Sequence, residues 1–96
     1  MAEKFTKFDS AEHLKTPEDM AAYFDACLEE AGDDPAFIAQ ALGVIARARG
    51  MTQLARDTGL ARENLYKALS AEGNPEFATI LKVIKALGLK LRAKAA

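Results

Sequence analysis

Hydrophobic residues recur at helical spacing along most of this chain, and proline or glycine residues separate the segments. Before the first segment, Thr16 supplies a hydroxyl that can cap a helix, and Pro17 suits the first helical position. Gly32 follows the segment and can end it. The apolar positions in between share one helical face: Met20, Tyr23, Phe24, Cys27, Leu28 and Ala31. The pattern predicts an acidic helix in residues 16–32.

A second helix is expected from Asp34-Pro35, which repeats this start signal, to Gly50, where it stops. Its apolar face is formed by Phe37, Ile38, Ala41, Leu42 and Ile45. Gly43 lies inside this helix, where glycine costs roughly 1 kcal/mol relative to alanine. We therefore expect close packing against a neighbour at Gly43.

The last helix is expected to start at Asn74-Pro75 and to end at Gly88. We expect its inward positions to be Phe77, Ile80, Leu81, Ile84 and Leu87.

Between these helices, Met51–Ser70 reads MTQLARDTGLARENLYKALS and predicts two short helices joined by a tight turn. Two helices that cross steeply need a small residue where they touch and a glycine that can take positive φ at the corner, which Ala55 and Gly59 supply. The inward positions are Leu54, Leu60, Leu65, Ala68 and Leu69. The outward positions of the second helix are Glu63, Tyr66, Lys67 and Ser70. The whole pattern predicts an all-α fold of about five helices that contains a helix-turn-helix.

The two ends of the chain are less regular. Phe5, Phe8 and Leu14 suggest a partly ordered arm in residues 1–15, the alternative being a mobile segment. Leu89–Arg92 alternates apolar and charged residues, which is typical of a half-buried strand that needs a partner such as a second copy. The alternative is a frayed basic tail. We thus expect one domain in residues 1–96, with an arm (1–15), an acidic helix (16–32), a helical DNA-binding core (34–87) and a tail or dimer strand (88–96).

The formal net charge is only −1, but the charge is unevenly spread. Met1–Gly43 carries ten acidic and three basic residues, and Val44–Ala96 carries four acidic and ten basic residues. The basic half can meet phosphates, whereas the acidic half would be repelled by DNA unless it faces away. The alternative for the acidic half is an ordinary solvated helix face.

Several function classes are not expected. The sequence has no apolar run of bilayer length, no secretory signal at the start and a single cysteine, which favours a cytoplasmic protein without a membrane span. His13 is the only histidine and Cys27 the only cysteine, so the sequence lacks the ligands of a zinc cluster. A cysteine–histidine nucleophile would have to combine these two residues, whose positions predict structural roles. EEAGDD at residues 29–34 lacks the spacing of a calcium loop, and there is no glycine-rich phosphate loop. We expect no enzyme activity, cofactor or metal.

The candidate DNA contacts lie on both short helices. Thr52 and Gln53 open the first helix, where unpaired amides and a partial positive charge suit a phosphate oxygen, and Arg56 can add a charged contact. Arg47 and Arg49 end the preceding helix, where positive charge offsets the dipole, so we interpret them as structural first.

On the second short helix, Arg62 and Lys67 can donate to guanine O6 and N7, and Glu63 can accept from a cytosine amino group. Asn64 and Tyr66 can contact bases or phosphates. The alternatives are that Arg62 and Glu63 pair with neighbours or with the helix dipole, and that the Tyr66 ring lies along the surface.

The twenty residues Met51–Ser70 resemble the helix-turn-helix of phage Cro and the wider Cro/lambda-repressor family, with Ala68 where most relatives are expected to carry a larger aliphatic residue. The chain lacks two residues often found between the Thr-Gln and Leu-Ala pairs of that family. The resemblance implies backbone positioning by one group of residues, namely Thr52, Gln53 and Arg56. It implies base reading by another group, namely Arg62, Glu63, Tyr66 and Lys67.

Nearly the whole chain, through FDSAEHL, RARGMTQLARDTGL, ENLYKALS and GNPEFATILKVIKALGLKL, also resembles the small antidote proteins of bacterial toxin–antitoxin modules. This resemblance implies a protein that neutralises a cognate toxin and represses the operon that encodes both. Because one recognition helix covers too few base pairs to select an operator, we expect a homodimer on double-stranded operator DNA. Such toxins are typically small basic proteins, and the acidic half is a suitable place to bind one. The alternatives are a stand-alone repressor and a protein-binding adaptor.

Overall fold

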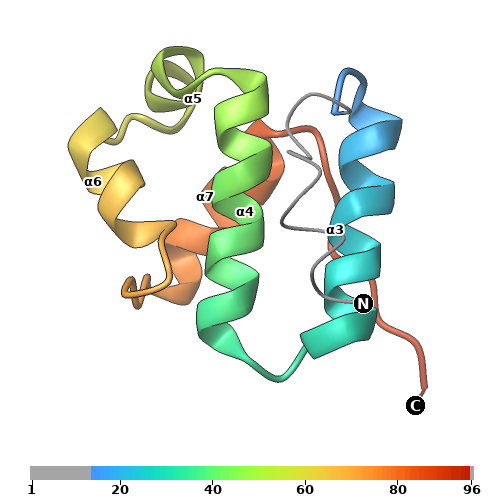
Figure 1. Cartoon of the computed structure of the whole chain (residues 1–96). Coiled ribbons are helices and arrows are strands. Elements are labelled where there is room, and N and C mark those ends of the chain that lie inside the picture. The colour runs from blue at the N-terminus through green and yellow to red at the C-terminus, as the bar shows by residue number, and fades with distance from the viewer. Residues whose placement is uncertain (1–13, 96) are drawn as a thin grey trace.

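The computed structural model describes residues 14–95, which form five α-helices and no strand (Figure 1). The helices are α3 (Pro17–Ala31), α4 (Pro35–Arg49), α5 (Met51–Thr58), α6 (Arg62–Ala68) and α7 (Phe77–Ala86). The expected all-α fold is confirmed. The expected arm with Phe5 and Phe8, together with His13, lies outside the described residues.

The first two helices begin where their capping residues predict. The Thr16 hydroxyl accepts a hydrogen bond from the Asp19 amide (3.1 Å), and the Asp19 carboxylate accepts one from the Thr16 amide (3.2 Å). This reciprocal pair satisfies donors that a helix start leaves unpaired. At α4, the Asp34 carboxylate accepts from the amides of Ala36 and Phe37.

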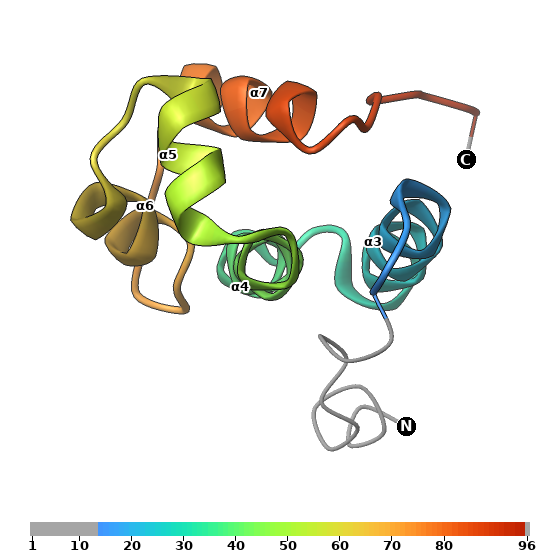
Figure 2. The ribbon, with the colours of Figure 1, turned by 90° about the horizontal axis from the view of Figure 1, so that it is seen from above.

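Helix α4 occupies the middle of the molecule (Figures 1 and 2). Helix α3 lies antiparallel along one side of α4, and the pair α5–α6 lies on the other side, while α7 packs on α5. The centre of the core is formed by fully buried side chains from every helix: Cys27, Leu42, Ile45, Leu54, Leu65, Val83 and Leu87.

The close packing expected at Gly43 is present. Gly43 is buried in α4, and a methyl group built on its Cα would collide with the backbone carbonyl oxygen of Leu69, which follows α6. The absence of a side chain thus lets the end of α6 lie directly on α4.

The prediction for α7 is wrong in two respects. The helix begins at Phe77, after Glu76, and not at Asn74-Pro75, because residues 73–76 run as an irregular connection. Phe77 is 66% exposed and Leu81 43% exposed, although both were expected to face inward. The buried side of α7 is formed by Val83, Ile84 and Leu87, with Ile80 half-buried. The apolar stripe of α7 is wider than the surface that its neighbours cover, so its edge stays outside.

After α7 the described chain is irregular, and the possible strand at Leu89–Arg92 is not formed. Gly88 has φ +79° and ends the helix as expected. Leu89 is half-buried against the core and its amide donates to the Ile84 carbonyl (3.0 Å), while Leu91 is exposed. A lone alternating segment has no neighbouring strand to pair with in one chain.

The longest helices of the described part, α3 and α4, have 15 residues each, and none of its helices is long and apolar enough to cross a membrane.

Cys27 is a core residue of α3. Burial raises the pKa of its thiol above the ordinary value of 9.0, the charge of Glu30 raises the pKa further, and a hydrogen bond with Tyr23 opposes the increase. The folded protein therefore favours the neutral thiol, in keeping with a packing role.

We expect Gly43→Ala to destabilise the fold by about 1–3 kcal/mol, because the added methyl group overpacks the contact with Leu69. The gain in helix propensity is only about 1 kcal/mol. Urea unfolding followed by circular dichroism measures the change. Gln40→Ala, at an exposed position of the same helix, is the matched control and stays within about 0.5 kcal/mol. A Gly43→Ala protein as stable as the wild type would contradict the close contact.

We expect iodoacetamide at pH 8 to alkylate Cys27 at least about tenfold more slowly in the folded protein than in urea, because only the thiolate reacts and burial disfavours it. Since the folded-state pKa is raised, the stabilising contribution of the neutral thiol is present below pH 9 and is lost as the pH rises through the folded-state pKa. Cys27 is the only cysteine, so mass spectrometry reports its labelling directly. Equal rates in the folded and unfolded protein would show that the thiol is accessible.

Candidate nucleic-acid interface

Helices α5 and α6 are joined by the short turn 59–61, where the sequence predicts it. Gly59 takes φ +76°, and its amide donates to the Ala55 carbonyl (2.9 Å). The Thr58 hydroxyl donates to the Leu54 carbonyl (2.8 Å) and accepts from the Leu60 amide (3.2 Å), so it ties both sides of the turn. The sequence interpretation missed Thr58. A threonine just before the glycine that ends a short helix is the signal that points to this role.

The inward sides of the pair fill the core much as expected. Leu54, Leu65 and Leu69 are buried, and three further positions are half-buried, namely Ala55, Leu60 and Ala68. The packing of these residues fixes α6 on the body of the domain and leaves its opposite side free.

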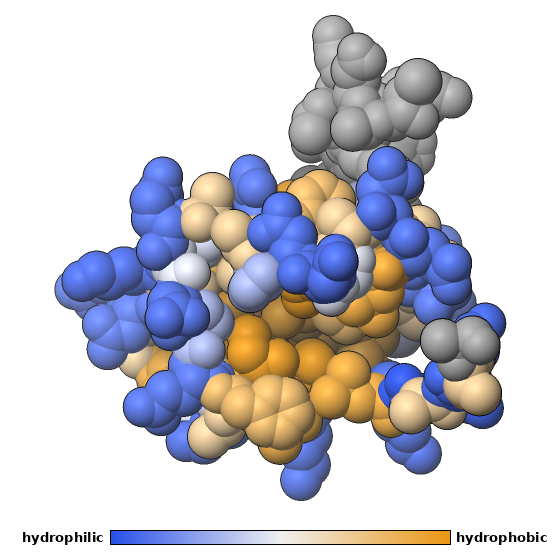
Figure 3. Space-filling view, turned by 90° about the horizontal axis from the view of Figure 1, so that it is seen from below, coloured by the Kyte–Doolittle hydropathy of each residue, from blue (hydrophilic) through white to orange (hydrophobic). Residues whose placement is uncertain are grey.

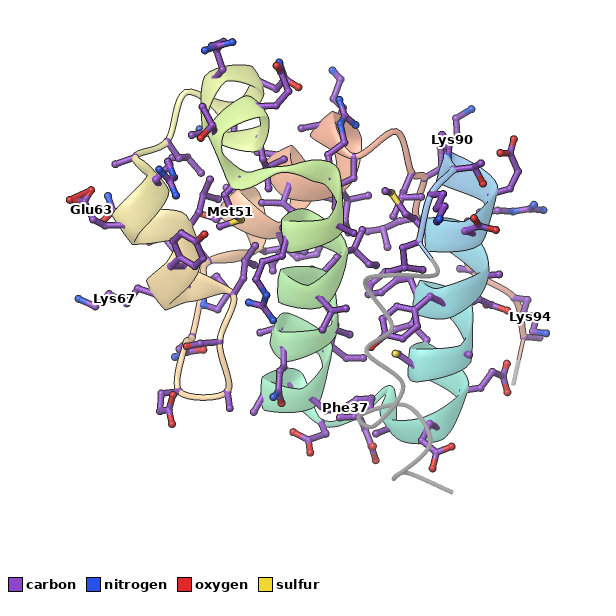
Figure 4. The ribbon with its side chains drawn as sticks, turned by 45° about the horizontal axis from the view of Figure 1, so that its top comes forward. Phe37, Met51, Glu63, Lys67, Lys90 and Lys94 are labelled. Atoms are coloured by element: carbon purple, nitrogen blue, oxygen red, sulfur yellow. The ribbon has the colours of Figure 1, made fainter. Side chains whose placement is uncertain are left out.

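The outward side of α6 carries charged and aromatic groups. Glu63 and Lys67 point away from the body of the domain (Figure 4), and Asn64 is exposed beside them. The Arg62 guanidinium lies 5.7 Å from the centre of the Tyr66 ring, in cation–π range. This contact orders Arg62 along the outer side of the helix. Ser70, expected outside, is half-buried, and its hydroxyl donates to the Lys67 carbonyl (2.9 Å).

At the start of α5, Thr52 and Gln53 are exposed, and no side chain caps the helix. The Gln53 amide group donates to the Asp57 carboxylate (2.9 Å). One amide hydrogen of Gln53 is therefore used within the helix.

Asp57 also forms an ion pair with Arg49 (3.4 Å), and the Arg49 guanidinium donates to the Ala86 carbonyl at the end of α7 (3.3 Å). Arg49 thus links α4, α5 and α7, as a structural role requires. The pairing leaves Arg56, Arg62 and Lys67 as the exposed positive charges of α5 and α6, against the single carboxylate of Glu63.

The structure brings the eight predicted contact residues onto the exposed surface of two adjacent helices: Thr52, Gln53, Arg56, Arg62, Glu63, Asn64, Tyr66 and Lys67. They lie on the side of α4 that is remote from α3 (Figure 1). No group of three His, Cys, Asp or Glu side chains within residues 14–95 is arranged to hold a metal ion.

Helix α3 presents charge of the opposite sign. It carries five carboxylates and no basic residue, and the carboxylates are all exposed: Glu18, Asp19, Asp25, Glu29 and Glu30. A groove of about 690 Å³ lies between α3 and the segment 88–92. Glu18 and Asp25 line its α3 wall, and Lys90 and Arg92 line the other. Helix α4 therefore separates the carboxylates of α3 from the basic residues of α5 and α6, whereas Lys90 and Arg92 face α3 across the groove.

Comparison with known proteins gives a family that covers almost the whole chain. The model of the family described as "Probable addiction module antidote protein" matches residues 4–95. A protein of Haemophilus influenzae Rd, described only as uncharacterized, is 51% identical over 94 residues, which cover 98% of this chain and 95% of that protein. No solved structure gives a significant match. The Cro/lambda-repressor resemblance of residues 51–70 is not tested by these matches and stays a prediction. The chain belongs to the family of probable addiction module antidote proteins.

Proposed function

We propose that this protein is an antitoxin that represses its own operon by binding operator DNA through α5 and α6 and that neutralises a basic toxin through α3. The family supports the antidote role. The observation that carries the proposal is the placement of the exposed basic residues of α5–α6 and the carboxylates of α3 on two sides of α4 (Figure 1).

In this proposal the outer side of α6 lies in the major groove of DNA. Lys67 and Arg62 donate to guanine, Glu63 accepts from a cytosine amino group, and Asn64 and Tyr66 contact bases or phosphates. The contact between Arg62 and Tyr66 supports base reading, because it lowers the number of conformations that Arg62 loses on binding.

Helix α5 positions the domain on the DNA backbone. The amides at its start, at Thr52 and Gln53, have no side-chain cap and suit a phosphate oxygen, while Arg56 adds charge. Gln53 contributes through its backbone amide, since its side chain is bonded to Asp57. Since one such helix contacts few base pairs, the protein acts as a homodimer on half-sites about 34 Å apart.

Helix α3 faces away from this DNA surface, so its carboxylates avoid repulsion by phosphates. The same carboxylates attract a small basic protein and speed its encounter. Because the two surfaces do not overlap, the protein can hold operator DNA and toxin together.

We expect Arg62→Ala to weaken binding to an inverted repeat upstream of the gene by about 1–3 kcal/mol, roughly 5- to 150-fold, and to relax specificity at one position. Fluorescence anisotropy at a fixed salt concentration measures both. Lys82→Ala removes the same charge from an exposed position of α7 and is the control, with a much smaller loss. An equal loss on random DNA would reduce Arg62 to a phosphate contact. The absence of preferred binding to the upstream region by wild-type protein would refute DNA reading altogether.

We expect the double variant Glu29→Lys/Glu30→Lys to associate at least about tenfold more slowly with the basic protein encoded next to the gene, most clearly at low salt. Surface plasmon resonance on the co-expressed partner measures the rate. The variant Glu72→Lys/Glu76→Lys makes the same charge change outside α3 and is the control. DNA binding by the α3 variant is unaffected. If no adjacent gene product forms a complex, the protein is a stand-alone repressor or an adaptor.

A further inference from the structure

The edge of α7 carries two apolar side chains that the domain does not cover. Phe77 is 66% exposed and Leu81, one turn later on the same side, is 43% exposed. Single exposed leucines are ordinary on protein surfaces, whereas adjacent exposed apolar side chains that form a patch are typical of contact surfaces. Neither side chain belongs to α5, α6 or the carboxylates of α3.

A hollow of about 270 Å³ opens beside this edge. It lies between the corner that joins α3 to α4 and the segment that leads into α7, and its apolar walls come from Leu28, Pro35, Ile38, Ala39, Pro75 and Ile80. Pro75 and Ile80, which line the hollow, lie within about three residues of Phe77 in the sequence, so the hollow opens close to the base of the protruding ring. Figure 3 shows apolar residues gathered in a hollow on this side of the molecule.

We propose that this face binds a second copy of the chain, with Phe77 of each copy inserted into the hollow of the other about a two-fold axis. In an isologous interface every group meets the surface that the partner presents at the symmetry-related place. A face that carries both a protruding apolar ring and an apolar hollow is complementary to itself. In a pair of identical copies, each ring is buried in the hollow of the other copy. The hollow is larger than one aromatic side chain, which leaves room for Leu81 at its rim.

Charge also favours a second copy over a basic partner. Among residues 14–95, Asp33 is the only ionisable residue that lines the hollow, whereas the groove along α3 is lined by Glu18 and Asp25 together with Lys90 and Arg92. A strongly basic protein is attracted to the carboxylates of α3 and gains little from the hollow. Two largely apolar faces of this kind meet with little like-charge repulsion, because the carboxylates near them, Asp33 and Glu76, are few and Glu76 is exposed to solvent.

The area available on this face limits the size of the interface. A buried aromatic side chain removes about 150–250 Å² of surface. Two Phe77 rings, their hollows, and the rims at Leu81 and Leu28 give on the order of 1,000 Å², the lower end of specific interfaces. An interface of this size is typical of weak or transient association, so a concentration series is needed to detect the dimer. None of the described residues that line the hollow belongs to α5 or α6. The α5–α6 surface of each copy therefore stays open for DNA in the dimer. The proposed function needs a dimer, and this inference specifies where its interface lies. The argument for the interface uses only the apolar face and does not depend on DNA binding.

Sedimentation velocity of the full chain from 1 to 500 µM tests the proposal. We expect a concentration-dependent dimer for the wild type and at least a tenfold higher dissociation constant for Phe77→Asp, with helical content unchanged because the ring is not part of the core. Leu91→Asp introduces the same charge at an exposed leucine outside this face and is the control, with an unchanged dissociation constant. A wild type that stays monomeric at every concentration, or a Phe77→Asp protein that dimerises like the wild type, overturns the proposal.

A photoreactive benzoylphenylalanine in place of Phe77 locates the contact directly. In a mixture of ¹⁴N- and ¹⁵N-labelled protein, we expect crosslinks between differently labelled chains that end in residues 28–39 or 73–80. Crosslinks within one chain, or to another surface of the second chain, overturn the proposal. A dimer that crosslinks as expected but does not prefer the upstream DNA would refute the proposed function and leave this interface intact.

Discussion

Helix α4 carries small and apolar side chains around most of its circumference, so it has to be covered by other helices on more than one side. Ala39, Ala41, Leu42, Ile45 and Ala46 are all buried. On one side the cover is α3, and on the other it is the α5–α6 pair, whose close approach depends on Gly43 lying against the backbone of Leu69. Because α4 is buried on two sides, it holds acidic α3 apart from the basic helices α5 and α6.

This arrangement resolves the conflict in the charge pattern. A chain with ten basic residues in one half and ten acidic residues in the other could neutralise itself by folding the halves together. Here α4, whose 15 residues include no acidic side chain, stands between α3 and the α5–α6 pair, and Lys90 and Arg92 are the basic residues that line the groove along α3. The carboxylates of α3 remain exposed to solvent. The ion pair with Arg49 of α4 neutralises Asp57, so Glu63 is the unpaired carboxylate left among the basic residues of α5 and α6. Each surface keeps the sign that its proposed partner requires.

The sequence predicted those parts of the fold that are set by local chemistry. Thr16, Asp34 and Gly59 act through hydrogen bonds or backbone angles within a few residues, and each was placed correctly. The exposure of Phe77 was not predictable in this way, because it depends on how much of α7 is covered by helices far away in the sequence. The bond between Gln53 and Asp57 was not predicted although its i, i+4 spacing is local, because an exposed glutamine can equally remain in water or bind a phosphate. The roles of the eight candidate contact residues remain predictions, because exposure shows that they are available and not what they bind.

The uncovered edge of α7 follows from the size of the domain. A chain of 96 residues buries a smaller share of its surface than a larger one, so an apolar stripe wide enough to secure α7 extends beyond the area that the other helices can cover. Ile80 and Ile84 pack against the core and anchor α7, whereas Phe77 and Leu81 form the edge of the stripe that the domain leaves uncovered. A partner that covers Phe77 adds stability by mass action without a change inside the core. The same apolar stripe that holds α7 in one chain thus favours association of two chains, and it does so on a face that leaves α6 exposed.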